Sequence, residues 1–366
     1  MESAPKENLT APGVMEKFKA AGKIAQDVLT TIREKCVDGA DVHELCVLGD
    51  NMIVEECSKI YNNKKMEKGV AFPVCISLND VCGHFSPLKN ESAKIANGDL
   101  VKIDLGVHID GFPVVLAHSL IVGGNGNDDG AKLRALSAAY DAIETAAKLL
   151  KPKNTNNQIT SALEKVITAY NCQPVEGVLS HDLKRYVIDG NNVIISKENP
   201  ENKVSQYEFK TEDVFALDIF VTANETEGKT KESELRTTVF KRNIDINQDL
   251  KTKNGRAFLT DIKIRFHDMA FSLNSFEDEL KARSGVNECI KTSHVQPYPV
   301  LQEKSKSPVA HFKWTVGVSS KRILILAGLT ERGFEPAKRG VVEDKDVQTL
   351  LDTPLVEFTT KQKKKK

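Results

Sequence analysis

Several patterns that would assign a function directly are scarce in this sequence. Aromatic residues make up 6% of its 366 residues, and neither an aromatic-rich stacking motif nor an RNP-type signature is present. The seven cysteines form no C-x-x-C pair, which disfavours a disulfide framework and a cysteine-ligated zinc site. Buried thiols in a reducing intracellular protein are the better interpretation. No apolar run approaches the roughly 18 residues that a membrane span needs, so no membrane partner is expected.

Net charge is absent too, because 51 basic residues balance 51 acidic ones. The balance is uneven along the chain, since five lysines lie in the last six positions. We expect residues 353–366 to form a disordered lysine-rich tail and residues 1–14 to form a flexible arm. The tail has three interpretations: a segment that binds RNA phosphates, an import signal, and an ordinary solvated end.

Hydrophobic periodicity divides residues 15–352, which we expect to form a single domain. Helical spacing covers Phe18–Cys36, Asp41–Ile60, Leu133–Leu150, Thr155–Tyr170 (with a capping box from Thr155 to Gln158) and Asp344–Leu351. Strand-like alternation covers Val175–Leu179, Val193–Ile195, Val214–Val221, Thr237–Phe240, His311–Val318 and Arg322–Leu326. Helices alternate with antiparallel strand pairs twice, which predicts an α+β fold.

A polar stretch interrupts this alternation from Lys241 onward. It predicts an inserted surface segment over about residues 241–290. Within it, helical spacing predicts helices at Ala257–His267 and Ser275–Ala282, and Gly285 is expected to end the second.

The most informative stretch is GDLVKIDLGVHIDGFPVVLAHSLIVG, residues 98–123. Asp110-Gly111 lies between two β-branched runs, which is a strong signal for a hairpin with a two-residue turn. That turn would place Gly106 opposite Val115. Asp104 and Val115 then become diagonal neighbours on one face, roughly 7–8 Å apart between backbones, with no side chain at Gly106 to separate them.

This hairpin resembles the one at the centre of the methionine aminopeptidases, and implies their pita-bread (creatinase/methionine aminopeptidase-like) fold. In that family two aspartates, a histidine and two glutamates hold a pair of divalent metals, which polarise the scissile carbonyl and generate hydroxide. Motif by motif, the resemblance places at these positions Asp104, Val115, His181 (after Ser180 in place of a glycine), Asp218 and Lys313. His84 and Asp189 stand where the family has substrate-binding histidines.

The implied ligand set is incomplete, because one carboxylate is a valine and another is a lysine. At about 4 Å and an effective dielectric near 20, a unit charge pair is worth roughly 4 kcal/mol, so an ammonium in place of a glutamate opposes a metal strongly. We therefore predict a pseudo-enzyme with no metal and no other cofactor, in which Lys313 occupies the cation site between Asp104 and Asp218. His84 and His181 would then be histidines that hydrogen-bond loop backbone.

Longer strings narrow the resemblance to one branch. FPVCISLNDVCGHFSPLK, GDLVKIDLGVHIDGF, VEGVLSHDLKRYVIDG and SFEDELKARSGVNEC closely resemble the proliferation-associated (ErbB-receptor-binding or curved-DNA-binding) proteins. Members of that branch resemble aminopeptidases without the activity, bind structured RNA and ribosomes, and move between cytoplasm and nucleolus. The resemblance implies a role in ribosome biogenesis or translation regulation, cytoplasmic with a nuclear and nucleolar pool. Its animal members also bind regulatory proteins, and whether this chain has such partners is not decided by the resemblance.

RNA contacts are expected at two cationic sites, recognising backbone and shape rather than bases. The candidates are Lys241, Arg242, Lys251, Lys253 and Arg256 in the insert, and Lys361, Lys363, Lys364, Lys365 and Lys366 in the tail. The ribosome and its RNA are the expected partners, and nothing in the sequence demands more than a monomer. Two alternatives stay open: an active metal-dependent methionine aminopeptidase, and a protein-interaction scaffold that binds no RNA.

Overall fold

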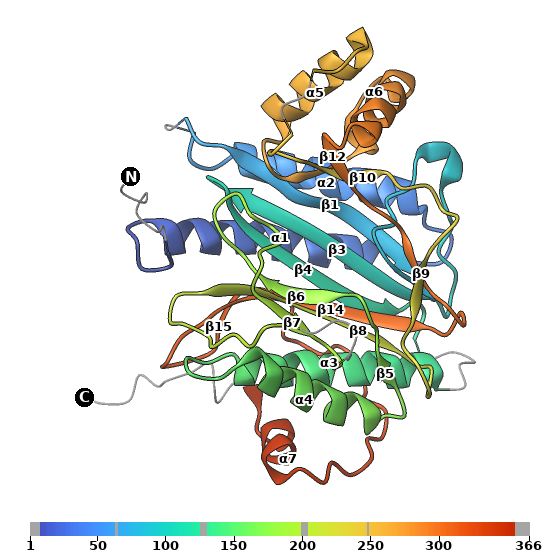
Figure 1. The fold of residues 1–366 in the computed structure, drawn as a ribbon. Coiled ribbons are helices and arrows are strands. Elements are labelled where there is room, and N and C mark those ends of the chain that lie inside the picture. Colours follow the sequence, from blue (N-terminus) through green and yellow to red (C-terminus); the bar gives the residue numbers. More distant parts are fainter. Residues whose placement is uncertain (1–7, 63–64, 125–129, 199–203, 247–248, 356–366) are drawn as a thin grey trace.

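A nine-stranded antiparallel sheet forms the centre of the molecule (Figure 1). The structure is a computed structural model that describes residues 8–62, 65–124, 130–198, 204–246 and 249–355. Along the sheet lie β1 (Lys68–Leu78), β3 (Leu100–Ile109), β4 (Phe112–Ile121), β14 (Val309–Gly317), β8 (Val214–Thr222), β6 (Leu179–Asp182) and β7 (Val193–Ile195). Two short strands attach at the side, β15 (Leu324–Ala327) on β14 and β5 (Gln173–Pro174) on β8.

The β3–β4 hairpin has the predicted turn and register. Asp110 and Gly111 have φ values of 55° and 76°, the left-handed backbone that a type I′ turn requires at both central positions. Gly106 pairs with Val115, and Asp104 pairs with Ala117. Asp104 and Val115 are therefore diagonal neighbours, as the sequence predicted.

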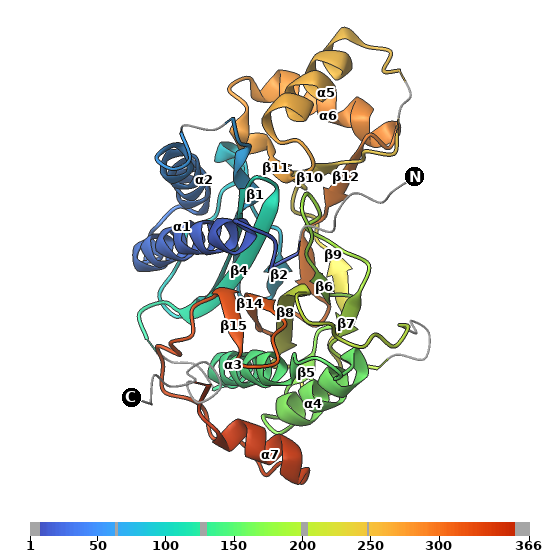
Figure 2. The ribbon, with the colours of Figure 1, turned by 90° about the vertical axis from the view of Figure 1, so that its left-hand side faces the viewer.

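Two pairs of helices cover one face of the sheet (Figure 2). In the N-terminal half, α1 (Val14–Lys35) and α2 (Val42–Ser58) share a core with β1, β3 and β4. In the C-terminal half, α3 (Ala131–Leu149) and α4 (Asn156–Thr168) pack on β8 and β14. Successive strand residues point to opposite faces, so the residues that alternate with this core, among them Asp104 and Lys313, lie on the face without helices.

A smaller unit projects from the first half of the sheet (Figures 1 and 2). It consists of β10 (Val239–Arg242), α5 (Lys253–Arg265), β11 (Ala270–Ser272), the 3₁₀ turn η2 (Leu273–Ser275), α6 (Glu279–Lys291) and β12 (Val295–Tyr298). Its three strands form a sheet of order β11-β10-β12, and it has its own apolar cluster. We call residues 239–298 the insert; the predicted segment, about 241–290, falls inside them.

A third sheet joins the insert region to the body. It is formed by β2 (Val81–Gly83), β13 (Leu301–Glu303) and β9 (Thr230–Glu232). The short 3₁₀ turn η1 (Lys89–Glu91) lies on the chain between β2 and β3.

Several predicted elements were wrong in their limits. The helix expected at Ala257–His267 is α5, which begins at Lys253, and the strand expected at Thr237–Phe240 is β10, which begins at Val239. The helix expected at Ser275–Ala282 is α6, which begins at Glu279 and continues past Gly285 to Lys291. Gly285 does not end it, because this glycine lies where α6 meets α5: a Cβ at Gly285 would lie 2.5 Å from Cβ of Phe258. Most of the strand expected at Val175–Leu179 is instead the connection between β5, which ends at Pro174, and β6, which begins at Leu179. It turns at Gly177, whose φ is 85°.

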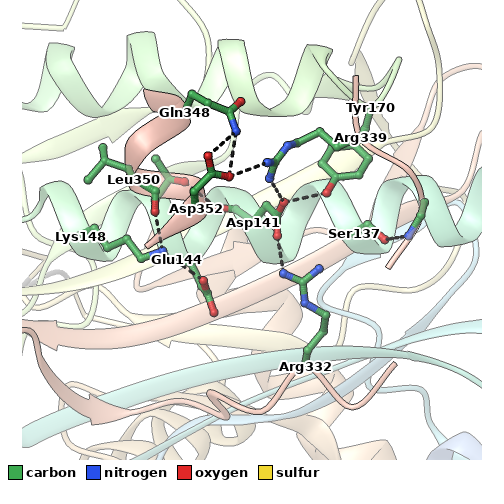
Figure 3. A network of polar contacts seen from close by, with 12 residues as sticks. Ser137, Asp141, Glu144, Lys148, Tyr170, Arg332, Arg339, Gln348, Leu350 and Asp352 are labelled. Atoms are coloured by element: carbon green, nitrogen blue, oxygen red, sulfur yellow. Dashed lines mark hydrogen bonds and ion pairs between the residues drawn. The ribbon is translucent and has the colours of Figure 1, made fainter. Parts of the chain in front are cut away.

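The chain after β15 returns across α3 and α4 and ends in α7 (Lys345–Asp352). Figure 3 shows the polar contacts that hold it there. The buried carboxylate of Asp141 accepts hydrogen bonds from Arg339 at 3.0 Å, Arg332 at 2.5 Å and the Tyr170 hydroxyl at 2.7 Å. Lys148 donates to the carbonyl of Leu350 at 2.9 Å. The body thus includes its C-terminal segment as an ordered part of the second half.

Both predicted termini fall largely outside the described residues. Residues 1–7 of the predicted arm and residues 356–366, with all five tail lysines, lie beyond the part of the chain that the structure describes. Among the helices of the described residues, none has the length and apolar character that crossing a membrane requires.

Candidate functional site

Three strands bring a lysine and two aspartates together on the open face of the sheet. Lys313 on β14 pairs in register with Asp218 on β8 and with Ala117 on β4, which in turn pairs with Asp104 on β3. Nζ of Lys313 lies 2.9 Å from Oδ2 of Asp104 and 3.2 Å from Oδ2 of Asp218. The predicted ion pair is therefore present, and the three side chains are 6–10% exposed.

The charges of this cluster stabilise one another. Burial would lower the pKa of Lys313, but the carboxylates of Asp104 and Asp218 raise it above the ordinary value of 10.5. Burial would likewise raise the pKa of Asp218, but Lys313 and His311 hold it well below its ordinary 3.8. Both groups are thus charged across the neutral pH range. A buried ammonium between two carboxylates is compensated electrostatically without any added ion.

His311 completes the cluster, although the sequence analysis missed it. Its Nε2–H donates to Oδ1 of Asp218 at 2.6 Å, and its ring stacks on Phe220 at 3.7 Å between centroids. It precedes Lys313 by two positions on β14, so strand alternation places both on one face. That spacing is the signal from which His311 could have been found.

Val115 and Gly106 close the space beside Asp104. Val115 is 4% exposed, and its backbone N–H donates to Oγ1 of Thr315 at 2.9 Å. A Cβ at Gly106 would lie 2.9 Å both from a Val115 methyl carbon and from the Phe72 nitrogen. An aliphatic group thus fills the position where the resembling enzymes have their second aspartate.

His181 lies on β6 and pairs in register with Ala216, two residues before Asp218. Burial lowers the pKa of His181; the carboxylate of Asp218 opposes this shift, and the charge of Lys313 adds to it. Nδ1 of His181 has no hydrogen-bond partner of normal geometry among the described residues, and the backbone group that influences the ring is that of Asp182. Ser180, which replaces the family's glycine, accepts a 2.8 Å hydrogen bond from the backbone N–H of Asp218. This contact fixes β6 against β8 beside the cluster.

His84 and Asp189, the two substrate positions, hold the insert instead. Nδ1–H of His84 donates to the carbonyl of Pro299 at 2.9 Å, the backbone role predicted for it. Asp189 accepts from Lys241 on β10 at 2.5 Å and from the hydroxyl of Tyr298 on β12 at 3.3 Å. Sequence reasoning missed Tyr298 and this contact, because both partners come from segments far apart in the chain.

Aromatic rings cover the cluster where the insert meets the body. The ring of Phe72 lies 5.6 Å from Nζ of Lys313, and Tyr298 packs edge-on against Phe72 at 5.3 Å. Burial, followed by the charge of Asp189, raises the pKa of Tyr298 well above its ordinary value. The insert therefore contributes the neutral ring of Tyr298 to the aromatic cover over the Lys313 cluster.

These residues do not fit a pair of divalent metals. Oxygen-rich dimetal sites need several carboxylates that bridge the two ions. Here the ammonium of Lys313 takes the position between the two aspartates, and Val115 offers no donor. In the part of the chain that the structure describes, no group of three or more His, Cys, Asp or Glu residues is arranged to hold a metal ion.

The predicted RNA-contacting residues of the insert divide into two sets. Lys241 and Arg242 form ion pairs within the chain, with Asp189 and Asp268 respectively. Lys251, Lys253 and Arg256 are exposed at the start of α5, although Arg256 also donates to the carbonyls of Leu250 and Lys251. The second set therefore presents charge to solvent, whereas the first mainly joins elements of the fold.

Comparison with known proteins agrees with this fold and site. The family model described as metallopeptidase family M24 matches residues 16–269. This chain belongs to metallopeptidase family M24. ERBB-3 binding protein 1 of Arabidopsis thaliana is 38% identical over 349 residues, covering 94% of this chain and 87% of the relative. Proliferation-associated protein A of Dictyostelium discoideum is 40% identical over 313 residues, covering 85% and 80%.

A solved structure supports the same assignment. That of a thermophilic Arx1 superposes with a TM-score of 0.84 at 27% identity, covering 94% of this chain and 99% of the other. The pita-bread fold and the resemblance to proliferation-associated and ERBB-3-binding proteins are thereby confirmed. Methionine aminopeptidases are related to this chain as well, at 25–26% identity, below the 38–40% of the two relatives given above.

Proposed function

We propose that this M24 protein is catalytically silent and binds structured RNA and ribosomes through cationic surfaces, in the cytoplasm and in a nuclear and nucleolar pool. The position of the Lys313 ammonium between Asp104 and Asp218 carries the first part of the proposal. Hydrolysis by this family requires metals to polarise a carbonyl and to generate hydroxide. Because the ammonium of Lys313 occupies the cation position, no metal is available there to polarise a carbonyl or to generate hydroxide.

Release of methionine from a Met-Ala-Ser tripeptide tests catalytic silence. With excess Co²⁺ or Mn²⁺, we expect product at the rate of the uncatalysed control. Turnover that Asp104→Asn abolishes would instead establish the active aminopeptidase alternative. An Asp80→Asn variant, on a carboxylate outside the cluster, serves as the matched control for that loss.

The second part of the proposal is supported by the exposed cations of the insert and by the lysines of the tail. Lys251, Lys253 and Arg256 lie together near the start of α5, and Lys263 follows on the same helix. Such clusters neutralise phosphates and release counterions without reading sequence. Together with the family resemblance, this charge favours ribosomal RNA as the partner over a role as a protein scaffold alone.

Co-sedimentation with ribosomes across a salt series tests RNA binding. We expect binding at low salt that weakens steeply as salt rises, with a log–log slope reduced by about 2 in Lys251→Glu/Lys253→Glu, because each lysine lost removes about one phosphate contact. Removal of residues 361–366 should lower binding further. Lys23→Glu/Lys59→Glu, with the same change in net charge on α1 and α2, should bind like the wild type.

Two outcomes contradict this part. Absence of co-sedimentation at low salt would favour the scaffold alternative. Equal losses from the α5 pair and the control pair would show that net charge alone, rather than the insert, mediates binding.

A further inference from the structure

A groove lies between α5 and α6. Its lining includes neither the residues of the Lys313 cluster nor the exposed cations at the start of α5. Its volume is about 430 Å³. The two helices that line it form the end of the insert farthest from the large sheet (Figure 2). The apolar part of its lining is formed by Ala257, Phe258, Phe276 and Ala282. A volume of this size suits a small ligand or a few side chains of a peptide.

The floor of the groove is a rigid aromatic arrangement. Phe258 and Phe276 stack with 5.1 Å between ring centroids, and the Arg265 guanidinium lies 5.0 Å from the Phe276 ring. Arg265 also donates to the carbonyl of Ser275 at 2.6 Å, which ties the C-terminal end of α5 to the segment before α6. Since Phe258 and Arg265 already lie against Phe276, this ring is a packed wall rather than an open platform for a nucleic-acid base.

The residues that line the groove carry more negative than positive charge, with three carboxylates against two cations. Both cations are already paired, Arg265 with Asp261 at 3.2 Å and Lys281 with Asp278 at 2.7 Å. Glu277 is a third carboxylate of the lining; it is exposed and forms no ion pair with any described residue. A phosphate backbone would meet this unpaired carboxylate, whereas a lysine or arginine of a partner would be attracted to it.

The two sides of α5 differ in kind. Ala257, Asp261 and Arg265 follow one another at intervals of four and line the groove. Arg256 and Lys263 lie away from that row, and both are exposed to solvent. Ile264, an isoleucine that is 68% exposed, neighbours Asp261 on the adjacent row and extends the apolar surface beyond the groove.

We propose that the groove between α5 and α6 binds a basic peptide segment of a partner protein, with a large apolar side chain against Phe258 and Phe276 and a lysine or arginine beside Glu277. The excess of carboxylates in the lining favours a basic partner, and the apolar surface of Phe258 and Phe276 favours a partner with a large apolar side chain. The proposal does not depend on RNA binding by the solvent side of α5, and the two surfaces are addressed by different substitutions.

Selection from a random dodecapeptide library against the immobilised full chain tests the proposal. We expect enriched sequences that combine Leu, Met or Phe with neighbouring Lys or Arg. The enriched peptide, synthesised with a fluorescent label, should lose about tenfold in affinity, about 1.4 kcal/mol, in Glu277→Lys and in Ala257→Trp. Both positions are exposed, so the variants should keep the wild-type melting temperature, which is measured in parallel.

A crossed control distinguishes this groove from the proposed RNA surface. Lys263→Glu should leave peptide binding unchanged and weaken binding of an RNA hairpin, while Ala257→Trp should do the reverse. The proposal is wrong if no basic apolar sequence is enriched, or if Glu277→Lys and Ala257→Trp leave the peptide affinity unchanged. It is also wrong if Ala257→Trp weakens binding of the RNA hairpin more than Lys263→Glu does.

Discussion

Lys313 and Asp104 form a buried ion pair, with 2.9 Å between Nζ and Oδ2, that joins the two halves of the sheet. The lysine comes from β14 and the aspartate from β3, 209 positions apart in the sequence. By the resemblance to methionine aminopeptidases, both residues stand at positions where that family has metal ligands. A covalently attached cation thus has a structural role here, holding two carboxylates that would otherwise repel each other.

Removing this cation should destabilise the fold strongly. In Lys313→Met the carboxylates of Asp104 and Asp218 stay buried without compensation, which typically costs about 3–5 kcal/mol. Urea unfolding followed by circular dichroism measures the loss as a lower midpoint. Lys59→Met is the matched control, because Lys59 is half exposed and its ion pairs lie on the surface of α2. A midpoint for Lys313→Met within error of that control would contradict the role of the pair.

The cluster should also give stability a defined dependence on acid. The Asp218 carboxyl has its pKa held below the ordinary 3.8 in the folded state, by Lys313 and His311 against the opposing effect of burial. Its contribution is therefore fully present above about pH 4 and is lost as pH falls through the lower folded pKa. The difference in unfolding free energy between the wild type and Asp218→Asn should be largest above pH 4 and shrink below it. A difference that grows on acidification would show that the folded carboxyl binds its proton more tightly than the unfolded one.

Asp189 should control how firmly the insert is attached. In Asp189→Asn the ion pair with Lys241 is lost, and because both groups are partly exposed the cost is about 0.2–1 kcal/mol. Amide hydrogen exchange should become faster in residues 239–242 and 295–298, and stay unchanged in β3 and β4. Asp268→Asn removes the partner of the neighbouring Arg242 within the insert itself, and should not produce this pattern. Equal exchange in the two variants would exclude Asp189 as the attachment point.

Rebuilding the family's ligand set should restore metal affinity. Val115→Asp/Asp218→Glu/Lys313→Glu supplies the two missing carboxylates and the longer third one, and removes the ammonium. Isothermal titration with Mn²⁺ should show uptake by this variant, and addition of Asp104→Asn should abolish it. Uptake that survives Asp104→Asn would place the metal elsewhere.

The parts of the site that the sequence predicted are those set by local rules. Asp110-Gly111 determines a turn, and the turn determines the register that makes Asp104 and Val115 diagonal neighbours. The side chains of Thr155 and Gln158 form the predicted capping box, and Asp41, the first residue of a predicted helix, caps α2. Each of these features depends on residues within a few positions of one another, so a local sequence pattern is enough to predict it.

The parts that could not be predicted depend on contacts between distant segments. Gly285 reads as a helix end, but its lack of a side chain instead admits Phe258 from α5. The contacts of Asp189 with Lys241 and Tyr298 require the insert to fold back over the sheet, which no local pattern encodes. His311 differs from these, since its spacing of two from Lys313 on β14 is a local pattern that places both side chains on one face.

Titration of the wild-type protein with Mn²⁺ and Co²⁺ at micromolar concentrations tests most directly whether Lys313 has replaced the metals. The lysine between Asp104 and Asp218 predicts no saturable uptake that depends on Asp104. Stoichiometric binding of two ions, lost in Asp104→Asn and kept in Asp80→Asn, would contradict it.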